Sequence, residues 1–502
     1  MKKLFALLFG SLFLAACGAA TSVADNHLII TQNGDPVTLD PHGTNDLVSA
    51  VVQNIIFERL VYLNPAGELE PSLATGWTRI DDRTYEFTIR QDVYFHNGLP
   101  MTVEDVAFSL KRAATATVIA PILGEIDPES IEIMDEETIR VGTFEPFVPL
   151  LAHLSHTGGN IVSQAAVEYY GERFGQHPVG TGAFKFVEWL AGDFIMLSRF
   201  EDYYGDAPHM DFVEFRNVPE AANRLIELET GEAHIALNIA PNDIPRLESD
   251  PNLELYRGTN LRTHYMGMNT TSGPLQDVRV RQAINYAINA EDIIAGILEG
   301  VGTLSTGPIS QDVWGANPDL VPYAHNPERG RELLAEAGYA DGFTTTLWVD
   351  VDVTRQAIAT VIRNQLLEIG ITAELQVVEW ATLLEATSAG NHDLFILGWT
   401  SVTLDADYGI FPLFHSSHTG AGGNRAFYNN PEVDRLLELA RAESDEARRL
   451  AYYHEIQEII VHDAPWAFLY VGEAVIGMNA NLRGFQPNPN GHHRVTDVWF
   501  EQ

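Results

Sequence analysis

The stretch PSLATGWTRIDDRTYEFTIRQDVYFHNGLPMTVEDVAFSLKRA, residues 71–113, decides how the rest of the chain is placed. Apolar and polar residues alternate over residues 85–89, which predicts a half-buried strand because successive side chains point to opposite faces. Asn97-Gly98 then predicts a tight turn. Thr102, with Asp105 three positions later, predicts the capped start of a helix. The expected unit is therefore a strand, a turn and a helix.

Twelve residues of this stretch stand in a characteristic order and spacing: Pro71, Leu73, Ala74, Trp77, Phe87, Arg90, Phe95, His96, Gly98, Pro100, Asp105 and Val106. This segment resembles that of the family 5 extracytoplasmic solute-binding proteins, the peptide and nickel type that serves ABC importers. The resemblance implies an α/β, two-lobed periplasmic-binding-protein fold (type II, cluster C) with an extra subdomain in the first lobe. It does not identify the ligand. His96 by itself is expected to tie a loop rather than to bind metal.

The 502 residues are too many for one ordinary core and predict two or three domains. Two extended passages about 200 residues apart, Met266-Gly267-Met268-Asn269 and Ile476-Gly477-Met478-Asn479, echo each other, so we place the hinge there. The expected organisation is a signal peptide (1–16), a tether (17–26), a first lobe (27–265, with a subdomain at about 45–180), a second lobe (266–475) and a return to the first lobe (476–502).

The N-terminus has the pattern of a secretory signal, since Lys2 and Lys3 precede an apolar run over residues 4–14. Leu14-Ala15-Ala16-Cys17 resembles a lipoprotein signal, which implies cleavage before Cys17 and lipid on its sulfur. Cys17 is the only cysteine, so the composition excludes a disulfide framework and a thiolate metal site. We expect an extracytoplasmic protein, in the periplasm or at the cell surface, whose membrane anchor is this lipid.

The chain is strongly acidic, with a formal net charge of −39. Nucleic acid is excluded as a partner because phosphate binding requires a basic surface. Hydrophobic content of 45% and charged content of 20% are typical of a folded domain rather than a disordered chain.

Strand and helix patterns alternate in the second lobe. Strands are expected at 343–349, 371–378 and 393–398, with helices at 355–369 and 380–388 between them. Strands linked by helical crossovers pair in parallel, so the second lobe is predicted to be α/β.

In an open parallel sheet, ligands bind at the carboxyl ends of the strands. Arg355 follows one strand, and Trp399, Asp405, Asp407 and Tyr408 follow another, so we expect them on one rim. An arginine can bind a carboxylate and an aspartate can hold an ammonium, which suits a zwitterion such as a peptide. Structural roles stay open as alternatives to ligand contact: Arg355 as a solvated residue in the first turn of its helix, and the two aspartates as caps of their loop.

The hinge passage supplies the remaining candidates. Tyr265 is a predicted ligand contact, and free amides near Met266 are expected to add strand-like bonds to a peptide backbone.

Gly398-Trp399 resembles the ligand loop of dipeptide and oligopeptide binders, in which an aspartate three residues after the tryptophan holds the peptide amine. Val402 stands at that position here. The continuation over residues 403–408 is more like the glutathione-binding branch of the family. The expected ligand is therefore a di- or oligopeptide or a glutathione-like peptide, delivered to the permease subunits of an ABC importer.

Two other functions are alternatives to peptide binding. A binder of chelated nickel or haem is the alternative within the family, but His415 and His418 are expected in a surface loop, and His454-Glu455 lacks the second histidine of a zinc motif. An extracellular hydrolase is disfavoured because no complete catalytic motif is present in the sequence after the signal. We expect a monomer without cofactor, metal site or enzymatic activity.

Overall fold

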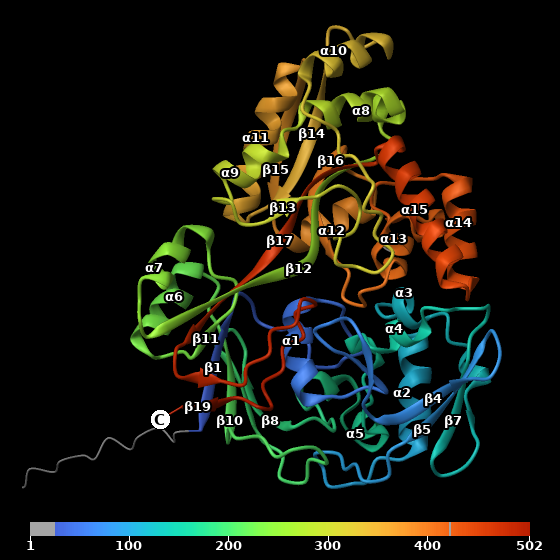
Figure 1. Ribbon diagram of the computed structural model, residues 1–502, viewed down its shortest axis with the longest axis vertical. Helices are drawn as coiled ribbons and strands as arrows, with labels where there is room; N and C mark the ends of the chain where they lie inside the picture. Colours follow the sequence, from blue (N-terminus) through green and yellow to red (C-terminus); the bar gives the residue numbers. More distant parts are fainter. Residues whose placement is uncertain (1–25, 421–422, 502) are drawn as a thin grey trace, which may run out of the picture.

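The computed structural model describes residues 26–420 and 423–501. The predicted signal peptide, Cys17 and the tether up to residue 25 lie outside the described residues. Two long antiparallel strands, β12 (Leu253–Met268) and β17 (Trp466–Asn479), connect two lobes, as Figure 1 shows. The main sheet has the strand order β15-β14-β16-β12-β17-β11-β1-β10-β9-β8, and β13 pairs with β17.

The first lobe is built on the end of this sheet that contains both parallel and antiparallel pairs. Its elements are β1 (His27–Gln32), α1 (Leu47–Ile56), β8 (Phe184–Leu190), β9 (Phe194–Arg199), β10 (Phe212–Asn217), α6 (Ala221–Thr230), β11 (Ile235–Ala236) and α7 (Ile244–Glu248). Strands β8 and β9 form an antiparallel hairpin. Helix α6 ends at Gly231, whose φ of +77° is a backbone conformation that glycine adopts without strain.

The subdomain of the first lobe contains residues 71–113. Its elements are β2 (Val61–Leu63), β3 (Leu69–Pro71), β4 (Ala74–Arg79), β5 (Thr84–Ile89), α2 (Val103–Thr115), α3 (Ala120–Leu123), β6 (Glu132–Ile133), β7 (Thr138–Gly142), α4 (Leu150–Leu154) and α5 (Gln164–Tyr170). The predicted unit is confirmed: Tyr85, Phe87 and Ile89 are buried, and Thr102 and Asp105 form a capping box at the start of α2. Strands β6 and β7 pair with each other in antiparallel fashion.

His96 ties two loops together, as predicted. Its Nε2 lies 2.9 Å from the carbonyl oxygen of Gly182, and its Nδ1 accepts a hydrogen bond from the amide of Gly180. Burial lowers its pKa to about 4, so the ring is neutral near pH 7 and both ring nitrogens are used by the backbone.

The second lobe is the predicted α/β unit. Its elements are α8 (Val278–Ala287), α9 (Ala290–Gly296), β13 (Thr303–Leu304), α10 (Pro327–Glu336), β14 (Phe343–Asp350), α11 (Val353–Glu368), β15 (Ile371–Val378), α12 (Trp380–Ser388), β16 (Leu394–Thr400), α13 (Ala406–Phe414), α14 (Pro431–Ala442) and α15 (Glu446–Asp463). Strand β14 pairs in parallel with both β15 and β16. The helical crossovers bring the chain back to the end of the sheet where the previous strand began, so each strand runs in the same direction.

The crossing between the lobes lies slightly earlier in the chain than the predicted boundaries at 265/266 and 475/476. The register of β12 against β17 shifts between Thr259 and Thr263, and from Arg262 onward β12 also pairs with β16 of the second lobe. Met266 is therefore bonded to strands on both sides, opposite Ile396 and Ala467. The expectation of free amides near Met266 is wrong, because β12 lies inside the sheet and not at its edge.

Each lobe has its own apolar cores although one sheet runs through both, and Val402 and Tyr408 of the second lobe pack against the core of the subdomain. The core of the second lobe lies on both faces of β14 and β16, while the first lobe has one core under β1 and β10 and another in the subdomain. The last strands, β18 (Leu482–Arg483) and β19 (Trp499–Phe500), return the chain to the first lobe. No helix among the described residues has the length and apolar character needed to cross a membrane.

Candidate ligand site between the lobes

A cavity of about 240 Å³ lies where the lobes meet beside the two crossing strands. Its walls come from the end of β1, the first turns of α1, the loop after β11 and the C-terminal return on the first-lobe side. Thr400, at the carboxyl end of β16, is contributed by the second lobe, and Asn260 and Arg262 by the crossing part of β12. Both lobes thus contribute to one small space at the hinge.

The cavity wall combines apolar side chains with polar ones and carries only one charge near pH 7. Five asparagines line it: Asn33, Asn238, Asn260, Asn488 and Asn490. His493 also lines it, but burial lowers the pKa of its imidazole to about 4 and leaves the ring neutral. No aspartate or glutamate is among the lining residues. Arg262 is therefore the charged group of this cavity.

Arg262 reaches the cavity because of the alternation of β12. Leu261 and Thr263 point into the protein and are buried, whereas Arg262 between them is half-buried on the opposite face. Its side chain crosses Gly398 on the neighbouring strand: a β-carbon at that glycine would lie 2.7 Å from Arg262 Nε. The absence of a side chain at Gly398 makes room for the guanidinium.

The guanidinium of Arg262 has no carboxylate within 4 Å in the part of the chain that the structure describes. Burial lowers the pKa of Arg262, and the positive charge of nearby Arg355 lowers it further. Both effects disfavour the charged form of a group that stays protonated at neutral pH. An anion beside Arg262 would relieve this unfavourable charge.

Arg355 lies at the carboxyl end of β14, where the sequence placed it, but its charge is already matched. Its Nε donates to Oδ1 of Asp350 at 2.6 Å and its Nη2 donates to the other carboxylate oxygen. Burial acts to lower the pKa of Arg355, yet the hydrogen bonds and charges of Asp350 and Asp352 raise it overall. Arg355 thus lies close enough to Arg262 to lower its pKa. Its own paired donors are already bonded to Asp350 and are not free for a ligand.

Asp405 and Asp407 do not reach the cavity. Asp405 receives hydrogen bonds of 2.6 and 2.8 Å from Arg449 and also accepts from the amide of Asp407 at the start of α13. Asp407 is fully buried, with Arg441 Nε at 2.9 Å and His153 Nε2 at 3.1 Å. Burial alone would raise the pKa of Asp407, but Arg441 and His153 hold it well below its ordinary value. The predicted amine-binding role does not fit this placement, because both carboxylates are used inside the protein.

The two predicted tyrosines are also interior residues. Burial raises the pKa of Tyr408 to about 12, and its hydroxyl lies 3.3 Å from the donor Nδ2 of Asn45. Tyr265 is 2% exposed and its ring stacks on Trp466 with 3.3 Å between ring centroids. A ligand contact by either side chain does not fit this arrangement, because packing covers both rings.

Trp399 is half-buried next to the cavity residue Thr400. Its indole Nε1 donates to the carbonyl of Tyr408 at 3.0 Å, which fixes the loop that follows β16. Trp399 itself does not line the cavity, so its expected place at the ligand-binding rim stays a prediction.

The loop after β16 touches the first lobe on the side away from the hinge. Val402 and Tyr408 pack in the core of the subdomain, and Arg441 of α14 donates to Glu125 at 2.7 Å. Figure 1 shows α3 and α4 facing α13 and α14 at this contact. Val402, at the position where related loops carry an acid, is 8% exposed, and its carbonyl accepts from Asn490 at 3.4 Å. That position is therefore an apolar lobe contact here.

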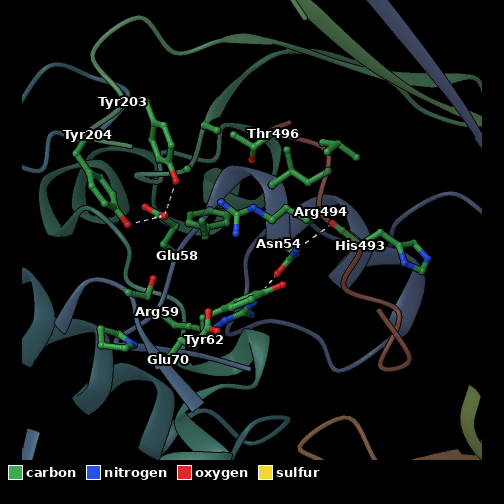
Figure 2. Close-up of a pocket in the computed structure, with 17 residues that line it drawn as sticks. Asn54, Glu58, Arg59, Tyr62, Glu70, Tyr203, Tyr204, His493, Arg494 and Thr496 are labelled. Atoms are coloured by element: carbon green, nitrogen blue, oxygen red, sulfur yellow. Dashed lines mark hydrogen bonds between the residues drawn. The ribbon is translucent and has the colours of Figure 1, made fainter. Parts of the chain in front are cut away.

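Two other cavities belong to single lobes. One of about 500 Å³ lies in the second lobe beside α9, and one of about 170 Å³ lies in the first lobe (Figure 2). In the latter, the Glu58 carboxyl accepts hydrogen bonds from Tyr203 at 3.0 Å and Tyr204 at 2.8 Å, and burial raises its pKa. Each of these two cavities is lined by residues of one lobe only, so neither brings the two lobes together around a ligand.

Residues 26–420 and 423–501 contain no group of three or more His, Cys, Asp or Glu side chains arranged to hold a metal ion. His454 Nε2 instead lies 3.1 Å from the carbonyl oxygen of Ala316.

Sequence reasoning missed Arg262 because it searched the loops that follow strands, whereas Arg262 lies within a strand. The available signal was an arginine in the alternating run Leu261-Arg262-Thr263-His264-Tyr265. Gly398, two residues before the register partner Thr400 on β16, lies 136 residues away in the chain, so only the sheet register brings the two together.

Two lobes joined by paired strands, with a cavity at the junction that is lined from both lobes and holds one charged group, define a two-lobed solute-binding protein. Residues 68–421 match the family described as "Bacterial extracellular solute-binding proteins, family 5 Middle". The chain therefore belongs to the bacterial extracellular solute-binding proteins of family 5, as its sequence resemblance implied.

Individual relatives agree with this assignment. The chain is 32% identical over 494 residues to the glutathione-binding protein GsiB of Salmonella typhi, covering 95% of this chain and 96% of that protein. The periplasmic binding protein DppA of Helicobacter pylori, solved with the peptide STSA, matches with a TM-score of 0.87 and 29% identity, covering 95% and 98% of the two chains. NikZ of Campylobacter jejuni, solved with Ni(L-His), shares the fold with a TM-score of 0.83 at 24% identity, covering 92% and 96%.

Proposed function

We propose that this protein captures a short peptide-like solute between its lobes and delivers it to the permease subunits of an ABC importer. The observation that carries the proposal is the hinge cavity, which is lined from both lobes and contains an arginine with no acidic partner. Similarity to a glutathione-binding protein and to a peptide-bound protein supports a peptide as the solute.

Closure of the lobes explains how binding is signalled. The strands β12 and β17 are the connection at the cavity, and bending near the register shift between Thr259 and Thr263 would separate the lobes. A ligand that contacts both lobes binds the closed form more tightly and shifts the population towards it. The cavity of about 240 Å³ lies just below the usual lower limit of about 300 Å³ for small-molecule sites, which favours a di- or tripeptide.

The residues proposed for the site differ in role. Arg262 contacts the ligand directly, and Thr400 and the asparagines supply uncharged hydrogen-bonding groups. Arg355 acts indirectly, because it holds the Asp350 carboxylate. Trp399 fixes the loop beside Thr400 through its bond to the Tyr408 carbonyl.

The remaining parts of the proposal concern place and chemistry. A lipid on Cys17 would anchor the monomer at the outer face of a membrane, and binding would break no bond in the solute. The nickel or haem alternative has support from the shared fold alone.

Calorimetry on the protein without residues 1–16, after dialysis against a chelator, tests this function. We expect saturable binding of reduced glutathione or of trialanine, with a rise in melting temperature that grows with ligand concentration. Nickel chloride and nickel–histidine serve as the competing arm. Binding of nickel–histidine together with no response to either peptide would overturn the proposal.

A further inference from the structure

We propose that Arg262 anchors a carboxylate of the ligand and makes the cavity select peptides with a net negative charge over neutral zwitterions. This inference rests on the proposed function and names the ligand chemistry of that same site.

The first step is the charge of the cavity. Arg262 is the only lining residue that is charged near pH 7, since His493 is held neutral by burial and the five asparagines are uncharged. The protein as a whole has a net charge of −39. A single positive group in a partly desolvated space therefore favours an anionic guest locally, although the surface as a whole repels one.

The second step is the availability of the guanidinium. The neighbouring Arg355 donates from Nε and Nη2 to the two carboxylate oxygens of Asp350. Arg262 has neither such a partner within 4 Å among the described residues nor a side-chain hydrogen bond to a protein acceptor there. A guanidinium binds a carboxylate through two parallel hydrogen bonds, and it does so most strongly where water is excluded.

The third step is the missing counterpart for an amine. Val402 occupies the place of the acid in the related ligand loops, and the two aspartates that follow it are paired with Arg449 and Arg441. A free ammonium of the ligand would meet only amide and hydroxyl oxygens. The free-energy cost of binding is therefore smaller for a peptide with two carboxylates and one ammonium than for a peptide with one of each.

The fourth step is that the asparagines of the opposite wall are already engaged. Asn488 and Asn490 are both 2% exposed: Asn488 donates to the carbonyl of Leu63 at 3.3 Å, and Asn490 accepts from the amide of His492 at 2.9 Å and donates to the carbonyl of Val402 at 3.4 Å. Because these amides already have protein partners, the charge at Arg262 decides the preference.

The experiment measures dissociation constants by calorimetry for four probes: reduced glutathione, its glycine-carboxylate ethyl ester, trialanine and trialanine amide. The variants are Arg262→Gln, which removes the charge, and Arg262→Lys, which keeps the charge but not the fork. Arg257→Gln on the same strand is the matched control, because Arg257 is paired with Glu473 and does not line the cavity. Circular dichroism and melting curves establish that each variant is folded.

For the wild type we expect glutathione to bind at least tenfold more tightly than trialanine, and at least one of the two capped probes to bind at least tenfold more weakly than its free acid. Arg262→Gln should remove these differences, Arg262→Lys should restore part of them, and Arg257→Gln should leave them unchanged. Equal affinity of the wild type for free and capped probes, or the same discrimination in Arg262→Gln, would overturn this inference alone. A folded wild type that binds none of the four probes would overturn the proposed function, and this inference with it.

Discussion

The two lobes meet at two places, and arginines serve opposite purposes in them. At the distal contact, Arg441 and Arg449 face Asp407 and Asp405, and each guanidinium has a carboxylate within hydrogen-bonding distance. At the hinge cavity, Arg262 has none among the described residues. A buried charge with a matched partner stabilises a conformation, whereas one without a partner is costly to keep and indicates a group reserved for a ligand.

The same comparison concerns Asp405 and Asp407, which are paired with arginines of the protein, whereas the sequence predicted ligand contacts for them. Asp407 is shared between Arg441 of its own lobe and His153 of the first lobe. It therefore belongs to the contact that holds the lobes together, while ligand recognition belongs to a cavity that contains no acid.

The largest expected effect comes from breaking the distal contact. Asp407→Ala leaves Arg441 and His153 without their shared carboxylate in a fully buried place, so the free energy of unfolding should fall by about 3 to 5 kcal/mol. Guanidinium denaturation at pH 7 measures this change. Glu432→Ala is the control on α14, because its pair with Arg435 is exposed to solvent and contributes little to stability. Equal losses in the two variants would mean that the distal cluster has no special importance.

The second effect is the pH dependence of that contact. Asp407 has a lowered pKa in the folded protein, whereas an unfolded aspartate titrates near about 3.9. Its contribution is therefore fully present above about pH 4 and is lost as the pH falls below that value. The stability difference between wild type and Asp407→Asn should shrink by about 2 kcal/mol or more between pH 5 and the acid limit of folding. Unfolding curves at several pH values test this, and a constant difference would contradict it.

A smaller effect is expected at the hinge cavity. Gly398→Ala puts a β-carbon 2.7 Å from Arg262 Nε and must displace that side chain, so ligand affinity should fall about tenfold, or about 1.4 kcal/mol. Gly76→Ala is the control, since a β-carbon there meets nothing within 4 Å and Gly76 is not among the glycines with positive φ. Calorimetry with the tightest-binding probe measures both. Unaltered affinity in Gly398→Ala would show that the path of Arg262 over this glycine does not matter.

The smallest effect should follow from Arg355→Gln. This change frees Asp350 to attract Arg262, which would compete with the ligand and weaken binding by about three- to fivefold, or roughly 1 kcal/mol. The double variant Asp350→Asn with Arg355→Gln removes the competitor and should recover affinity. A loss as large as that of Arg262→Gln that the double variant does not recover would instead show that Arg355 itself binds the ligand.

Much of the fold follows from spacing along the chain. The alternation over residues 85–89, the capping box at Thr102 and Asp105, and the helices between β14, β15 and β16 depend on neighbours two to four residues apart. These patterns gave the α/β second lobe and the subdomain unit correctly. Where the chain crosses between the lobes depends instead on how distant strands pair, which spacing along the chain does not specify.

The sequence by itself determined the local elements, the parallel order in the second lobe and the family, because each depends on residue types at short and regular intervals. Only the tertiary structure decided which charges are free. Asp405 and Arg449 lie 44 residues apart, and Arg262 and Gly398 lie 136 apart, so their relations arise from packing and sheet register. Whether a charged side chain binds a ligand or a neighbour depends on such distant partners, which no local pattern encodes.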